Sequence, residues 1–209
     1  MTKLNLPSVT LAGIDGYDVH RIARAVDVSS AHISFGAVMV MSDLPIDRPD
    51  FVGIPPLKSL SSYCDFLLHG LVNYVKTDFV LNIQHDGFVL NPDAWTDEFL
   101  EYDYIGAPWI MGNMRDVVGN GGFSLRSRRL LSIVDVEIGC SGDRHEDLLI
   151  CIDSRHRLES LGLKFAPAKL ASRFSVENIP GYAYGPVWDG QFGYHGTSTD
   201  ISKWRGCAS

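Results

Sequence analysis

The chain alternates between short apolar runs and segments whose apolar positions have helical spacing. Residues 8–14 form a first apolar run, which ends in the turn residues Asp15 and Gly16. Apolar side chains then recur at helical spacing across residues 17–26, and residues 33–41 form a second apolar run. Short apolar runs bounded by turn residues are typical of buried strands. The order strand, turn, helix, strand predicts the opening of a nucleotide-binding α/β unit.

The same alternation continues to the end of the chain, and its centre is the apolar run at residues 79–83. The pattern predicts a mixed, mostly parallel central sheet flanked by helices. In chain order it further predicts a proline-bearing loop at 45–56, helices at 59–76 and 93–100, a short strand within 102–109, a loop at 113–118, a strand that leads into a helix at 129–134, a helix that opens at His145, and short strands at 163–168 and 171–177.

Length and composition favour one globular domain, which we predict to span residues 1–209. The sequence is 45% hydrophobic and 21% charged, a normal globular mixture that argues against disorder. Its formal net charge is −7, so bulk electrostatics do not favour binding to nucleic acid. We therefore predict no nucleic-acid partner, and we expect recognition of a diphosphate to require a bound cation or local donors.

The cysteines and the absence of long apolar runs bear on the compartment. None of the four cysteines forms a Cys-x-x-Cys pair, which argues against a zinc ribbon or a thioredoxin-type site. Cys64 and Cys151 fall within apolar patterns and are predicted to be buried thiols. The sequence shows neither a signal-peptide pattern nor an apolar run of membrane-spanning length. We predict no membrane span and a reducing, cytoplasmic setting.

Candidate chemistry begins at the end of the central apolar run, where Gln84, His85, Asp86 and Gly87 follow one another. A carboxylate at the carboxyl end of a buried strand lies where open α/β sheets bind ligands. The alternative is that Asp86 and Gly87 form only a turn. The first strand is followed by no Gly-x-Gly-x-x-Gly motif, and no Walker A lysine is present, which argues against the dinucleotide-binding and P-loop folds.

Further candidates follow along the chain. Trp109 comes directly after a short predicted strand, and glycines surround an asparagine within residues 119–122. Glu146 and Asp147 open a predicted helix, and His195 lies in a glycine-rich aromatic segment. Each feature alone has a structural explanation: a core tryptophan, a turn, carboxylates that favour a helix start, or a loop histidine. Their order is more informative than any one of them.

Taken in order, these features resemble a compact glycosyltransferase of the GT-A fold across residues 9–195. Residues 103–109 and 119–128 are also similar to a family of small bacterial proteins assigned to that superfamily. The resemblance implies a single GT-A-like domain with mixed, mostly parallel sheet. Gln84 departs from the pattern, because the first acidic residue of the Asp-x-Asp motif would stand there.

The resemblance also implies roles for particular residues. Asp86 and His195 would hold a divalent metal, Mn²⁺ or Mg²⁺, and Asp147 would be the catalytic base, with Glu146 as the second choice. A hard cation with oxygen ligands would stabilise the charge on a leaving nucleoside diphosphate. An imidazole ligand suits Mn²⁺ better than Mg²⁺. The implied nucleotide-binding residues are Asp15, Asp43, Gln84 and Asp86, and the implied acceptor-binding residues are Trp109, Asn120, Gly121 and Gly122.

We therefore predict a metal-dependent, inverting glycosyltransferase that moves a sugar from a nucleotide donor to a hydroxyl on a glycan or a surface polysaccharide precursor. Two alternatives stay open. Gln84 keeps open a GT-A-like protein that binds a glycan or nucleotide without catalysis. A sugar-phosphate nucleotidyltransferase would share the architecture, but it would carry a glycine-rich basic loop where this chain has residues 15–18, Asp-Gly-Tyr-Asp.

Overall fold

The structure is a computed structural model that describes residues 3–111, 114–178 and 187–196. Its strands are β1 (Leu4–Ile14), β2 (Ile33–Ser42), β3 (Phe51–Gly53), β4 (Phe79–Ile83), β5 (Gly87–Val89), β6 (Tyr104–Ile105), β7 (Pro108–Met111), β8 (Met114–Val118), β9 (Phe123–Ser127), β10 (Ser175–Asn178) and β11 (Gly193–Gly196). Its α-helices are α1 (Val19–Ser30), α2 (Leu60–Asp65), α3 (Arg128–Glu137), α4 (Glu146–Leu148), α5 (Arg155–Ser160) and α6 (Ala168–Phe174). Short 3₁₀ and π segments span Phe66–Gly70, Leu71–Asn73, Pro92–Ala94, Asp97–Glu101 and Leu149–Asp153.

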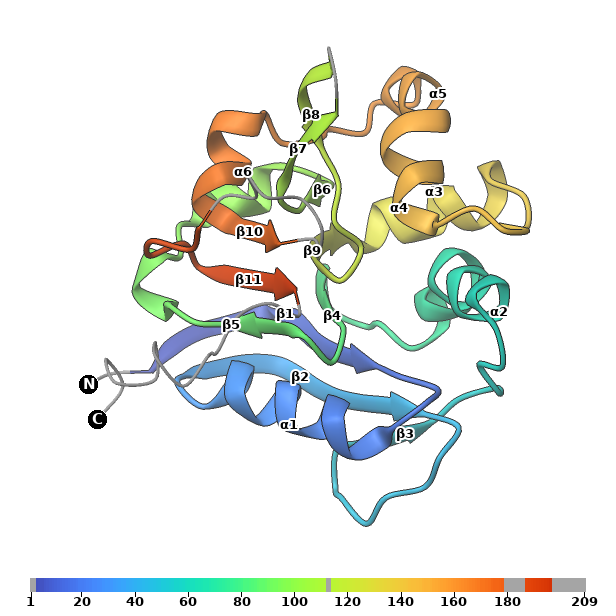
Figure 1. The fold of residues 1–209 in the computed structure, drawn as a ribbon, viewed down its shortest axis with the longest axis vertical. Coiled ribbons are helices and arrows are strands. Elements are labelled where there is room, and N and C mark those ends of the chain that lie inside the picture. The colour runs from blue at the N-terminus through green and yellow to red at the C-terminus, as the bar shows by residue number, and fades with distance from the viewer. Residues whose placement is uncertain (1–2, 112–113, 179–186, 197–209) are drawn as a thin grey trace.

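A six-stranded sheet forms the centre of the fold, in the order β3-β2-β1-β4-β9-β6 (Figure 1). β1 pairs in parallel with both β2 and β4, and β2 pairs in parallel with β3. β9 runs antiparallel to both β4 and β6. The predicted fold class is confirmed: the protein is a mixed α/β structure whose central, mostly parallel sheet is flanked by helices.

Alternation along the central strands assigns their side chains to two cores. Leu11 and Leu81, which are partners in the β1–β4 pair, belong to the core that includes the apolar face of α1. Ala12 and Val80, each one residue away along its strand, belong to the second core, with residues of the 60–75 region. Successive side chains of a strand point to opposite faces of a sheet, so this sheet is covered on both faces.

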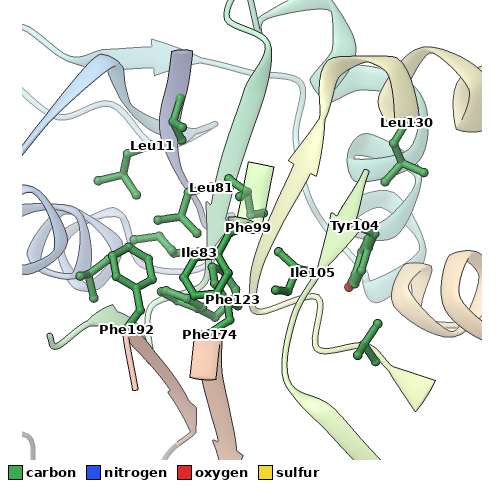
Figure 2. Close-up of a cluster of buried hydrophobic side chains, with 14 of the residues drawn as sticks. Leu11, Leu81, Ile83, Phe99, Tyr104, Ile105, Phe123, Leu130, Phe174 and Phe192 are labelled. Atoms are coloured by element: carbon green, nitrogen blue, oxygen red, sulfur yellow. The ribbon is translucent and has the colours of Figure 1, made fainter. Parts of the chain in front are cut away.

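A second, three-stranded sheet of order β10-β11-β5 lies beside the central sheet (Figure 1). An aromatic cluster joins the two sheets (Figure 2). Phe123 of β9 packs against Phe174 at the end of α6, with ring centroids 5.4 Å apart, and Phe174 packs against Phe192 at 5.7 Å. Aromatic pairs at such distances stabilise a core beyond the area they bury. The cluster fixes the strand that carries His195 next to the strand that begins at Phe123.

Most predicted elements are confirmed, including the helix that opens after Ser59. The Ser59 hydroxyl accepts from the Ser62 backbone N–H, and the Ser62 hydroxyl accepts from the Ser59 backbone N–H. This reciprocal pair is a capping box. The helical turns then change from α to π to 3₁₀ and end at Asn73. Cys64 and Cys151 are buried free thiols, as predicted. Within the described ranges, no helix has both the length and the apolar character needed to cross a bilayer.

Several predicted segments differ from the structure. Residues 51–53 of the predicted loop form β3, which pairs with β2, and the predicted helix at 93–100 is two short 3₁₀ segments. Residues 114–118 form β8, which pairs with β7, instead of a loop. Residues 163–168 make only an isolated bridge, between Phe165 and Tyr104, instead of a strand. Residues 171–177 are divided between α6 and β10. Short apolar runs suit a buried helix as well as a strand, and the helical spacing of Leu170, Ala171 and Phe174 explains the last case.

Candidate functional site

A cavity of about 420 Å³ opens at the carboxyl end of β4. It collects residues from distant parts of the chain, including four carboxylates. Its lining residues are Leu60, Tyr63, Gln84, Asp86, Gly121, Gly122, His145, Glu146, Asp147, Glu177, Asn178, His195 and Gly196. Ligands of open α/β sheets bind outside the carboxyl ends of the strands, so this is where the fold class places a ligand.

His195 reaches the end of β4 because β11 pairs with β5. In that antiparallel pair His195 is the partner of Gly87, the residue after Asp86. Its Nε2 lies 3.2 Å from Gln84 Oε1 and 3.3 Å from Asp86 Oδ1. A Cβ on Gly122 would lie only 2.1 Å from the same nitrogen, so the missing side chain makes room for the imidazole. The structure brings Asp86 and His195 into contact, and their role as metal ligands stays a prediction.

Glu177 binds the opposite edge of the imidazole, and the sequence analysis assigned it no role. It is the direct partner of His195 in the parallel β10–β11 pair, and its Oε1 lies 3.3 Å from His195 Nδ1. Its other oxygen accepts a hydrogen bond of 2.6 Å from Trp109 Nε1. An acidic residue at the end of a predicted strand was the available signal. The sequence did not show that this strand pairs with the segment around His195.

The charges of this cluster are mutually stabilised. Burial alone would lower the pKa of His195, but contacts with Asp86 and Glu177 raise that pKa to about 9. Burial alone would raise the pKa of Asp86, but the contacts with His195 keep it below its usual range. The imidazole is therefore cationic at neutral pH, between two carboxylates.

The side chains at this point fit a divalent cation. Asp86 Oδ1 is buried, and the ring nitrogens His195 Nε2 and His85 Nδ1 lie 3.3 Å and 3.6 Å from it. Gln84 donates from Nε2 to the Tyr63 hydroxyl at 3.1 Å, which turns its Oε1 toward His195. Neighbouring ligands of an octahedral ion lie about 3 Å apart, close to the observed separations. Among the described residues no three His, Cys, Asp or Glu side chains form a metal-binding group, so Gln84 and substrate or water oxygens would complete the coordination.

Asp147 lines the same cavity and is held by backbone donors. Its Oδ2 accepts from Gly121 N at 2.8 Å, and its Oδ1 accepts from Leu148 N at 2.8 Å. Burial, followed by the nearby Glu146 carboxylate, raises the pKa of Asp147 to about 6. A carboxylate with a pKa this close to neutrality can accept a proton efficiently.

Glu146 is committed to a buried ion pair. Its Oε1 accepts from the Arg126 guanidinium at 2.9 Å, and its Oε2 lies 3.7 Å from the Cys64 sulfur. Arg126 is 0% exposed and Glu146 is 3% exposed. A Cβ on Gly121 would lie 2.1 Å from Glu146 Oε1, so the glycine backbone lies directly against this pair. Glu146 also lines the cavity, and its role as the second candidate base stays a prediction.

The predicted acceptor residues fall into two groups. Gly121 and Gly122 line the cavity, whereas Trp109 and Asn120 are not among its lining residues. Trp109 reaches the cavity only through its hydrogen bond to Glu177. Asn120 is fully buried with a φ of 71°, and its Oδ1 accepts from Phe123 N, so it shapes the turn before β9. Acceptor binding by all four residues stays a prediction.

Asp15 and Asp43 lie at the ends of β1 and β2, outside the cavity lining. Asp15 accepts from the backbone of Tyr17 and from Arg21 Nε at 2.7 Å. Asp43 pairs with Lys58 at 2.6 Å, and this hydrogen bond lowers the pKa of Asp43. A link to the cavity exists through His85, whose Nδ1 lies 3.9 Å from Asp15 Oδ2 and 3.6 Å from Asp86 Oδ1. Their nucleotide-binding role stays a prediction.

Residues 53–195 match the model of a protein family described as "Protein of unknown function (DUF5672)". This match covers more than half of the chain and includes every lining residue of the cavity except Gly196. No curated protein matches the sequence.

Solved structures with low sequence identity share the fold. A glycosyltransferase involved in the glycosylation of the major capsid of PBCV-1 is 10% identical, with 98% of each chain covered and a TM-score of 0.51. The bifunctional IspDF from Campylobacter jejuni is 9% identical, with 78% of this chain and 49% of that chain covered and a TM-score of 0.47. The galactosyltransferase LgtC, in complex with donor and acceptor sugar analogues, is 14% identical, with 90% and 86% covered and a TM-score of 0.42. The first of these structures shows that the fold is similar to that of a glycosyltransferase.

Proposed function

Because the chain belongs to the family described as "Protein of unknown function (DUF5672)", we propose a function from its cavity: a metal-dependent, inverting glycosyltransferase that uses a nucleotide sugar. One observation carries the proposal. The cavity at the end of β4 brings together Asp86, with His195 beside it, and Asp147, which is held by the Gly121 backbone. A cation-binding group and a base candidate in one cavity match the two requirements of this transfer.

The diphosphate of the donor would be held through a divalent cation bound by Asp86, His195 and Gln84. When bound there, a divalent cation would neutralise the charge that develops on the nucleoside diphosphate as the sugar–phosphate bond breaks. The cavity supports this need for a cation, because its carboxylates would otherwise repel a diphosphate. His195 would release its Nε2 proton when it binds the cation, while its Nδ1 keeps the contact with Glu177.

Asp147 would receive the proton of the acceptor hydroxyl. As the hydroxyl oxygen forms a bond to the sugar carbon, the bond from that carbon to the donor phosphate breaks, and the nucleoside diphosphate leaves with the bonding electrons. The two backbone N–H groups that contact Asp147 fix its orientation, and its pKa of about 6 leaves it ionised and basic at neutral pH. Attack from the face opposite the leaving group would invert the configuration of the sugar.

The proposal is tested by screening nucleotide sugars for hydrolysis or transfer, with and without Mn²⁺. Unfolding temperatures measured with nucleoside diphosphates provide a first selection, because a ligand at about 100 times its Kd stabilises the folded state by about 2.7 kcal/mol. We expect stabilisation that depends on Mn²⁺ and turnover of at least one nucleotide sugar. A parent protein that turns over no member of the screen contradicts the proposed activity.

A non-catalytic protein that binds a glycan or nucleotide is the second candidate. Gln84 stands where the resembling family has an acidic residue, and the described residues contain no metal-binding group of three His, Cys, Asp or Glu side chains. The same screen separates the two candidates. Binding of glycans or nucleotides without turnover favours this second function.

A further inference from the structure

We propose that Glu177 and Trp109 are positioning residues that fix the imidazole of His195 for the cation-binding group of the cavity. This inference rests on the proposed function, in which His195 binds the divalent cation. It also assigns Trp109 a task different from the contact with an acceptor sugar that the sequence suggested. The support is a continuous chain of contacts from β7 through β10 to β11, which ends at Asp86.

Both oxygens of Glu177 are already engaged. Oε2 accepts the Trp109 indole N–H at 2.6 Å, and Oε1 lies 3.3 Å from His195 Nδ1. The Glu177 side chain is only 13% exposed although it lines the cavity. Each carboxylate oxygen keeps a second lone pair, but these two contacts fix the direction of the Glu177 side chain between the indole and the imidazole. A carboxylate fixed in this way orients its neighbour.

The orientation that results is specific. A carboxylate only accepts hydrogen bonds, so contact with Glu177 keeps a proton on His195 Nδ1, and a cation that binds at Nε2 would displace the proton there. Nε2 then faces Gln84 Oε1 at 3.2 Å and Asp86 Oδ1 at 3.3 Å. Carboxylates that accept from the second nitrogen of a metal-binding histidine fix its tautomer and its ring angle.

Two backbone features hold this arrangement in place. Glu177 and His195 are direct partners in the parallel β10–β11 pair, and laterally paired side chains lie on the same face of a sheet. The absent side chain of Gly122 leaves room for Nε2 on the other side. The imidazole is therefore fixed by contacts at both edges, whereas Trp109 fixes only the carboxylate.

The test measures Mn²⁺ affinity by isothermal titration calorimetry in Glu177→Gln and Trp109→Phe. A glutamine offers one oxygen to two donors, Trp109 Nε1 and His195 Nδ1, so Glu177→Gln disrupts the chain although its size is kept. We expect about 10–100-fold weaker Mn²⁺ binding, the loss typical of such orienting partners. Trp109→Phe removes only the hydrogen bond to Glu177 and is expected to weaken binding by less than Glu177→Gln does.

Two matched variants control for the substitutions themselves. Glu101→Gln changes an exposed glutamate, and Trp95→Phe removes an indole hydrogen bond to Asp97 away from the cavity. Both controls are expected to bind Mn²⁺ like the parent. Unfolding curves of all four variants identify any loss that comes from misfolding instead of misorientation.

A second readout does not depend on metal or turnover. The ¹⁵N NMR resonances of the His195 ring in the metal-free protein are expected to shift in Glu177→Gln and to stay unchanged in Glu101→Gln. If these resonances stay unchanged in Glu177→Gln, the positioning role is wrong. If they shift but the parent binds no Mn²⁺, the positioning of His195 stands and the metal-dependent function fails. Unchanged Mn²⁺ affinity in a folded Glu177→Gln protein overturns the inference for the cation-binding group.

Discussion

Carboxylates stand at the ends of β1 and β2 and at the end of β4, but these two regions use them differently. At the first, Asp15 accepts from Arg21 and Asp43 pairs with Lys58, so each carboxylate has a cationic partner close in sequence. At the second, Asp86 and Asp147 share a cavity. There Asp86 contacts His195, which comes from a distant part of the described chain.

The difference shows what position on a strand does and does not determine. The carboxyl end of a strand brings an acidic side chain to the ligand-binding edge of the sheet in both regions. Whether that side chain is free to act depends on its partners. Local salt bridges occupy Asp15 and Asp43, whereas Asp147 accepts from two backbone N–H groups and has a pKa raised to about 6.

The largest effect is expected for Asp147→Asn, which keeps the size of the side chain and removes its basicity. Transfer should be at least about a hundredfold slower, the low end for a lost general base, while donor nucleotide binding stays nearly unchanged. Initial rates and nucleotide affinity measured on the same preparation check both parts. Asp93→Asn, at an exposed aspartate, is the control. Full transfer activity in Asp147→Asn would make the base assignment wrong.

Glu146→Gln is a less suitable test of the base. It leaves the buried Arg126 without its charged partner, and breaking a buried pair in this way costs about 3–5 kcal/mol. Loss of activity in that variant would therefore reflect folding as much as chemistry.

The next largest effect separates the two regions directly. Asp86→Ala should abolish the increase in nucleoside diphosphate affinity that Mn²⁺ gives, and His195→Ala should reduce it by less. Asp15→Ala should instead lower the free energy of unfolding by about 1–3 kcal/mol, because it leaves the partly buried Arg21 and two backbone N–H groups without their acceptor. Calorimetry and denaturant unfolding give the two profiles. The same response to Mn²⁺ in Asp86→Ala and the parent would contradict the metal assignment.

Much of the fold could be predicted because its signals are local. The apolar runs of β1, β2 and β4 and the helical spacing of α1 were sufficient for a parallel α/β core. The division of residues 171–177 between helix and strand was missed, because a short apolar run fits either. The partners of those residues lie far along the chain, at Gly193–Gly196 for β10.

The candidate site was predictable in part for the same reason. Asp86 ends an apolar strand and Asp147 opens a helix, and both positions are visible in one segment of sequence. Glu177 was missed, because its importance comes from lateral pairing with His195 and from Trp109, 68 residues away. The ion pair between Glu146 and Arg126 likewise joins residues from separate segments of the sequence. Sequence position identified the residues that stand at strand ends, but not the residues that hold them.

A pH profile gives an effect of intermediate size. A base acts when it is deprotonated, so activity should be full above the pKa of Asp147, about 6, and fall as the pH drops through it. At pH 5, kcat/KM should be about tenfold below its plateau, since below the pKa each further pH unit lowers the deprotonated fraction of the base about tenfold. Measurements of kcat/KM between pH 5 and 8 check this. The fall near pH 6 should disappear in Asp147→Asn, and its persistence would assign it to another group.

The smallest effect is expected for Lys58→Met, which breaks the salt bridge to Asp43. Lys58 is 69% exposed, and exposed pairs contribute about 0–1 kcal/mol, so the loss in free energy of unfolding at pH 7 should not exceed about 1 kcal/mol. Lys58 lowers the pKa of Asp43 below its ordinary value of 3.8, so the contribution is present above that value and is lost as the pH falls through the lowered pKa. Parent and variant should therefore converge in urea unfolding at sufficiently acid pH, and added salt should narrow the gap at pH 7. A loss well above 1 kcal/mol that does not respond to salt would mean that the lysine stem packs against Asp43 and its neighbours, and that charge is not its main contribution.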